Sequence, residues 1–169
     1  RQEDQTTARH LDLISLPSRV VENLFWMGRY AERAEASLRL LRTVFVMLNG
    51  EEPISDICKP LILSAVTEVT GSKPGFINAT PKLISQPEHD LLAIVKDANR
   101  HGSVSANLTA MLNCADQSTE LLSTDTLRVI NDIRDGLAEL DSTLAGDLAA
   151  APEEALDPLV TALMALAGL

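Results

Sequence analysis

The stretch RVVENLFWMGRYAERAEASLRLLRTVFVML, residues 19–48, decides the fold of this chain. It contains no proline and a single glycine, and Asn49-Gly50 ends it. Its apolar side chains recur at steps of three and four residues, which is the period of one face of an α-helix. The spacing predicts a helix of about eight turns. The members of this stripe are Val20, Leu24, Met27, Ala31, Ala34, Leu38, Leu41 and Phe45.

The rest of the chain predicts further helices and no strands. No stretch alternates polar and apolar residues between hairpin dipeptides. Four of the five aromatic residues lie in the first helix, so the core is expected to be aliphatic, as in a helical bundle. We expect an all-α bundle of about five or six helices with one long N-terminal helix. The expected further helices begin near residues 53–56, 88, 103, 124 and 152, and a short turn is expected around 82–84.

Two of these helix starts carry candidate capping residues. Ser103 is expected to cap the helix that follows it, and Thr124 or Asp125 is expected to cap the next one.

Composition and charge exclude several classes of protein. The chain has 169 residues, 14 basic and 24 acidic, with a net charge of −10, which fits one domain. We expect no nucleic acid partner, because neutralising phosphates needs a basic face. We expect no membrane span, because no apolar stretch approaches about 20 residues. Cys58 and Cys114 stand apart without a CxxC pair, so reduced thiols and a cytoplasmic location are expected.

Residues 1–15 are polar and show no sustained periodicity, so we interpret them as a tail or interdomain linker. The helical domain is then expected to span residues 16–169. Since the chain starts at Arg1, we expect it to be part of a larger protein.

The long helix also carries an unusual group of charges. Arg29 and Arg33 lie within about 40° of each other around the helix axis, and Glu32 is within reach of Arg29. This face lies opposite the main apolar stripe, yet Phe25, Trp26 and Leu40 flank it. We therefore expect a partly dry seam, where unpaired charges would cost several kcal/mol.

Two interpretations of this group remain open. One is a structural ion network that stabilises the bundle. The other is a ligand site in which Arg29 and Arg33 bind a carboxylate or phosphate and Glu32 orients one guanidinium. The network would comprise Glu22, Arg29, Glu32, Arg33 and Glu35.

No catalytic or metal-binding pattern accompanies these charges. There is no Glu-x-x-His and no His-x-x-x-His, so a metal site in the bundle has little support. Cys114 has no neighbouring cation that would lower the pKa of its thiol, so it is expected to be a structural cysteine. We predict no catalytic residues, metal or cofactor, and leave open whether the chain is an enzyme.

Residues 16–35, LPSRVVENLFWMGRYAERAE, resemble the opening helix of the alpha-E family, a bacterial all-helical domain of unknown function. The Glu-Arg motif of that family maps onto Glu32 and Arg33. Residues 103–131 also resemble later helices of the family. Family members are typically about twice this length, with a second Glu-Arg helix in their later half. Residues 163–169 resemble the segment before that half, so the resemblance implies that this chain is the N-terminal half.

The resemblance also implies a functional context. Alpha-E domains are commonly encoded beside, or fused behind, a circularly permuted ATP-grasp ligase, often with transglutaminase-like proteins nearby. This implies a non-catalytic accessory domain of an ATP-dependent system that forms peptide or amide bonds, with the ligase domain as partner. One alternative is a ligand- or acceptor-binding or enzymatic domain whose site uses the Glu-Arg helix. A further alternative is a helical scaffold that self-associates as a homodimer.

Overall fold

A computed structural model describes residues 18–145 and 152–169, and these form seven α-helices, one 3-10 helix and no strand. The all-α fold predicted from the sequence is therefore confirmed. The additional helix, α4, arises where a short turn was expected, and it begins where Thr80 Oγ1 accepts a hydrogen bond from the N–H of Leu83. The elements are α2 (Ser18–Asn49), α3 (Cys58–Thr70), α4 (Pro81–Ser85), α5 (Glu88–Lys96), α6 (Val104–Asp116), η1 (Thr119–Leu121), α7 (Thr124–Leu144) and α8 (Pro152–Ala167).

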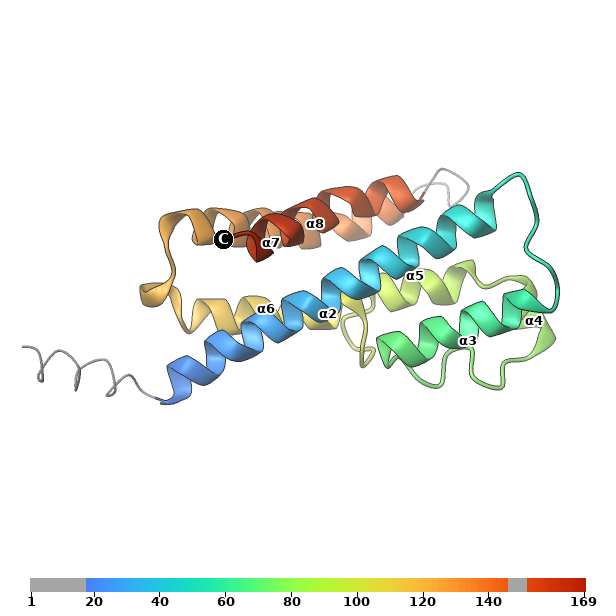
Figure 1. Ribbon diagram of the computed structural model, residues 1–169, viewed down its shortest axis with the longest axis horizontal. Coiled ribbons are helices and arrows are strands. Elements are labelled where there is room, and N and C mark those ends of the chain that lie inside the picture. The colour runs from blue at the N-terminus through green and yellow to red at the C-terminus, as the bar shows by residue number, and fades with distance from the viewer. Residues whose placement is uncertain (1–17, 146–151) are drawn as a thin grey trace, which may run out of the picture.

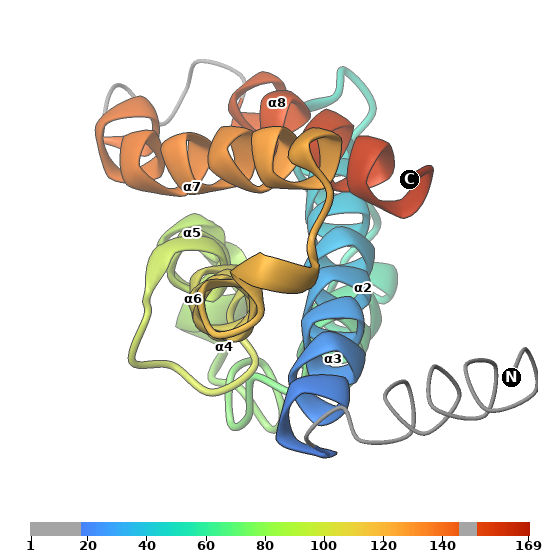
Figure 2. The ribbon, with the colours of Figure 1, turned by 90° about the vertical axis from the view of Figure 1, so that its left-hand side faces the viewer.

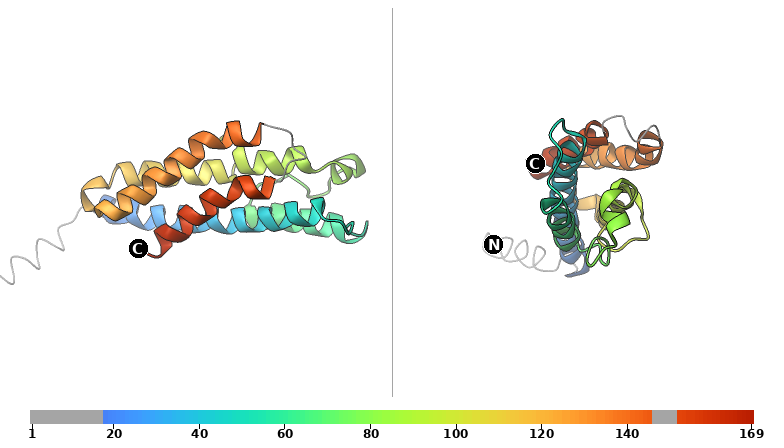
Figure 3. Two further views of the ribbon diagram at one scale, coloured as in Figure 1. Left: turned by 90° about the horizontal axis from the view of Figure 1, so that it is seen from above. Right: turned by 90° about the vertical axis from the view of Figure 1, so that its right-hand side faces the viewer.

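The long helices form a bundle in which neighbouring segments alternate in direction (Figure 1). Helices α5 and α6 follow one another along one line, antiparallel to α2. Helix α7 then returns, and α8 runs back beside both α7 and α2 (Figures 2 and 3). Helix α3 packs against the C-terminal half of α2. The architecture is an up-down-up-down bundle with α3 and α4 added at one end.

The stripe predicted on the long helix forms the centre of the core. From Ala31 onward its members are buried, and α2 contacts both α6 and α8. The first three members, Val20, Leu24 and Met27, are half-buried. The core is mostly aliphatic, as expected, and its largest fully buried side chains are Phe45, Phe76, Leu38, Leu41, Leu63, Leu91, Ile94, Leu108, Met111, Ile130, Ile133 and Leu156.

Serine hydroxyls cap two of the helices. Ser103 Oγ accepts the N–H of Ala106 at 3.0 Å, which confirms the cap predicted for α6. The prediction for α7 is wrong by one or two residues, because Ser123 is the cap and accepts the N–H of Thr126 at 3.1 Å. Ser123 precedes the first helical residue, so its hydroxyl can reach an N–H that has no partner in the helix.

None of the described helices combines the length and apolar character that crossing a bilayer requires. The linker predicted for residues 1–15 lies outside the described residues.

Candidate functional site

The charged face of α2 is exposed to solvent. Arg29 Nη1 lies 3.1 Å from Glu32 Oε2, and the two side chains are 49% and 70% exposed. Glu35 pairs with Arg39 instead, at 2.9 Å. Glu22 is exposed and makes no ion pair with a residue of the described ranges. The predicted group is thus divided, because Arg29 pairs with Glu32, Glu35 pairs with Arg39, and Glu22 joins neither pair.

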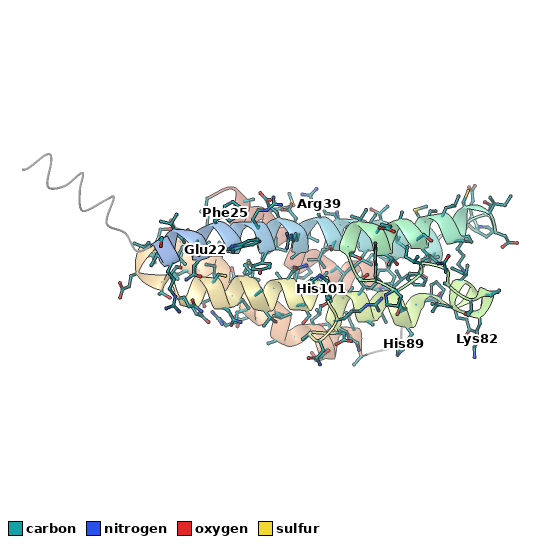
Figure 4. The ribbon with its side chains drawn as sticks, turned by 90° about the horizontal axis from the view of Figure 1, so that it is seen from below. Glu22, Phe25, Arg39, Lys82, His89 and His101 are labelled. Carbon is teal, nitrogen blue, oxygen red and sulfur yellow. The ribbon has the colours of Figure 1, made fainter. Side chains whose placement is uncertain are left out.

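The expectation that these charges lie in a partly dry seam is therefore wrong. Helices α6 and α8 cover the apolar stripe of α2, and the side chains of Glu22, Arg29 and Glu32 remain exposed. Exposed ion pairs contribute about 0–1 kcal/mol, because water screens them. Of the apolar groups expected to flank the charges, Leu40 is half-buried, whereas Phe25 is 60% exposed and Trp26 36% exposed. Figure 4 places Glu22, Phe25 and Arg39 along α2.

Arg33 has a different environment from its neighbours. Its guanidinium carbon lies 6.0 Å from the ring centre of Trp26 and 5.9 Å from that of Tyr30. The two rings are themselves 5.7 Å apart, because residues at i, i+4 and i+7 share one side of a helix. Cation–π contact at this distance holds the guanidinium against the aromatic pair. Within residues 18–145 and 152–169, no carboxylate forms a salt bridge with Arg33.

Arg33 lines a cavity of about 550 Å³ between α2, the end of α3 and the start of α6. Figure 4 labels His101 in the segment between α5 and α6. The cavity combines a cation, hydrogen-bonding side chains and small apolar groups, a composition suited to a polar ligand with a small body. Its lining residues are Tyr30, Arg33, Ala36, Ser37, Glu68, Val69, Thr70, Gly71, His101, Gly102, Ala106 and Asn107.

A half-buried ion network lies next to this cavity, in a place that the sequence did not indicate. Arg100 donates to both carboxylate oxygens of Asp90, at 2.8 and 3.2 Å, and to the carbonyl oxygen of Ser72 at 2.9 Å. The side chains of Arg100 and Asp90 are 15% and 24% exposed. The network ties the end of α3 to the first turn of α5. Its members are separated by 10 and 28 residues, so no helical spacing could reveal it.

Gly102, which lines the cavity, lets two backbone segments approach each other closely. Its φ is +80°, a left-handed conformation that favours glycine. A Cβ atom at this position would collide with the carbonyl oxygen of Thr70 and lie 2.8 Å from the carbonyl carbon of Gly71. This close contact places His101, the preceding residue, at the cavity.

The other sequence candidates lie elsewhere. Cys58 is exposed and Cys114 half-buried, and burial raises the pKa of the Cys114 thiol. No group of three or more potential metal ligands occurs among the residues that the structure describes. A second cavity, of about 570 Å³, lies between α3 and α4 and contains none of the predicted site residues.

Comparison with known proteins agrees with the motif on α2. A family model described as "a predicted alpha-helical domain with a conserved ER motif" matches residues 16–169. The chain belongs to the Alpha-E family. Glu32-Arg33 is the only Glu-Arg dipeptide in its sequence, so these residues correspond to the ER motif. The two residues of the Alpha-E motif therefore lie in different environments. Glu32 pairs with Arg29 at the surface, and Arg33 lines the cavity.

The curated relatives of this Alpha-E chain are much longer proteins. The uncharacterized proteins Rv2567 of Mycobacterium tuberculosis (strain H37Rv) and Mb2597 of Mycobacterium bovis are each 29% identical to it over 145 residues. The match covers 75% of this chain and 16% of each relative. No solved structure matches the chain.

Proposed function

We propose that this Alpha-E chain is a non-catalytic accessory module of an ATP-grasp ligase that forms amide bonds, and that its cavity binds a carboxylate-bearing ligand or acceptor. The observation that carries the binding role is the position of Arg33. Its guanidinium lines the cavity, rests on Trp26 and Tyr30, and has no carboxylate partner among the described residues. The ligase association extends the family resemblance to this chain.

The chemistry of the cavity favours recognition of a carboxylate. A guanidinium presents several N–H donors in a fixed plane and binds carboxylates through two parallel hydrogen bonds. Stacking on the rings restricts its motion, so less entropy is lost when a ligand binds. His101 and Asn107 add hydrogen-bonding groups to the same cavity.

Binding of N-acetyl-alanyl-alanine, compared with its C-terminal amide, tests the carboxylate site. Titrations followed by NMR should show preferred binding of the free acid, with shifts of amide signals around the cavity. Arg33→Ala should weaken binding of the acid about tenfold, and Arg33→Lys should weaken it less, because lysine keeps the charge but not the planar fork. Arg29→Ala is the matched control, because Arg29 pairs with Glu32 outside the cavity. Equal binding of acid and amide would overturn the carboxylate role.

The complete gene and its neighbours test the ligase association. An ATP-grasp domain encoded in the same or an adjacent reading frame supports it, and release of ADP by that ligase should then depend on Arg33. A gene with no ligase in either position overturns it and leaves the cavity proposal to the binding experiment.

A further inference from the structure

The cavity beside Arg33 is electrically polarised. Arg33, on α2, supplies a fixed positive charge. Helix α3 supplies the opposite sign, because the carboxylate-bearing Glu68 and the last residues of the helix line the same cavity.

The end of α3 adds negative potential of its own. Gly71 is in the left-handed conformation and its N–H bonds to the carbonyl of Glu68, while the N–H of Ser72 bonds to the carbonyl of Thr67. These bonds leave the carbonyls of Val69 and Thr70, the last two residues of α3, without a backbone N–H partner in the described chain. The C-terminal end of a helix carries a partial negative charge, which favours cations.

Glu68 is available to a ligand. Its carboxylate lies 3.4 Å from Lys73 Nζ, and both side chains are more than half exposed. Exposed pairs of this kind contribute little, so a ligand cation can compete with Lys73. Between the two charged walls, Ala36, Val69 and Ala106 leave space for small apolar groups.

From this arrangement we propose that the ligand is a zwitterion, a free amino acid or short peptide whose carboxylate binds Arg33 and whose ammonium group binds Glu68 and the end of α3. The proposal rests on the carboxylate role of Arg33 and adds the requirement for a free amine. A ligand with both charges can pair with Arg33 and with Glu68. A simple anion leaves Glu68 without a ligand partner, and its negative charge is repelled by the Glu68 carboxylate.

Three dipeptide probes separate the two requirements: alanyl-alanine, N-acetyl-alanyl-alanine and alanyl-alanine amide. NMR titration of the chain should give the lowest Kd for alanyl-alanine, with each blocked peptide binding about fivefold or more weakly, as expected for loss of one charge-assisted contact. Glu68→Gln should remove the preference for the free amine and keep the preference for the free carboxylate. Asp125→Asn is the matched control, because Asp125 lies at the start of α7, away from the cavity, in an exposed pair with Arg128.

The outcomes distinguish this inference from the proposed function. If N-acetyl-alanyl-alanine binds as tightly as alanyl-alanine and its binding still requires Arg33, the zwitterion is overturned and the carboxylate site stands. If Glu68→Gln keeps the full preference for the free amine while its thermal unfolding matches that of the native chain, the role of Glu68 is overturned. If none of the three peptides binds, the zwitterion and the carboxylate site are both overturned.

Discussion

Arg100 holds Asp90 through both carboxylate oxygens and reaches the carbonyl of Ser72 with the same guanidinium. This contact joins the end of α3 to α5. The residues that follow Arg100, His101 and Gly102, line the cavity. This half-buried network lies beside the candidate site, whereas the pair of Arg29 and Glu32 on α2 is exposed.

Replacing Arg100 with alanine should destabilise the fold. It would leave the Asp90 carboxylate, which is 24% exposed, without its partner, at a cost of about 1–3 kcal/mol. Urea denaturation followed by circular dichroism measures the change in free energy of unfolding. Arg29→Ala is the control and should change the free energy of unfolding by less than about 0.5 kcal/mol, since the ion pair of Arg29 with Glu32 is exposed. Equal effects of the two variants would contradict the assignment.

Alanine at Gly102 and at Gly28 should have opposite effects. Gly102→Ala should destabilise the chain by more than about 1 kcal/mol, because of its positive φ and the collision with the backbone of α3. Gly28 lies within α2 with nothing within 4 Å of its Cβ position, so Gly28→Ala should stabilise the helix by about 0.5–1 kcal/mol. Thermal unfolding of both variants checks the two signs, and a stabilising Gly102→Ala would refute the close contact.

The two cysteines should react with a thiol reagent at different rates. Burial raises the pKa of the Cys114 thiol, so at pH 8 a smaller fraction of it is the reactive thiolate than in an ordinary cysteine. Its partial burial also hinders access of the reagent. Ellman's reagent should therefore label the exposed Cys58 first, and labelling of Cys114 should accelerate as the pH rises toward its pKa. The single variants Cys58→Ser and Cys114→Ser identify each phase. A faster Cys114 at pH 8 would be inconsistent with the structure.

The N-terminal turns of α2 should support self-association at high concentration. Val21 and Phe25 lie one turn apart and are 53% and 60% exposed, with Trp26 beside them. Sedimentation velocity should show a dimer whose fraction grows with concentration. Phe25→Glu should weaken dimer formation about tenfold, because it places a charge in the apolar contact. Asp125→Asn, on α7, serves as the control, and a native chain that stays monomeric at every concentration would exclude the homodimer.

Local patterns were enough to predict most of the helices. The stripe from Ala31 to Phe45 is buried, and Ser103 caps α6, because helical periodicity and capping depend on residues within a few positions of each other. Local patterns misjudged the charges around Arg29, because the apolar groups beside them do not show whether another helix covers them. They also missed the network of Asp90 and Arg100, whose members come from different elements.

The sequence by itself determined that the chain is all-helical, that residues 19–48 form its central helix, and that the stripe of this helix from Ala31 to Phe45 is buried. It also singled out the group of Arg29, Glu32 and Arg33, and the family resemblance identified Glu32-Arg33 as a motif. Only the tertiary structure decided that Arg33, Glu68 and His101 line one cavity, whereas Glu32 pairs with Arg29 outside it. The physical reason is that a helix period orders side chains around one axis, whereas a site depends on how separate helices pack against each other.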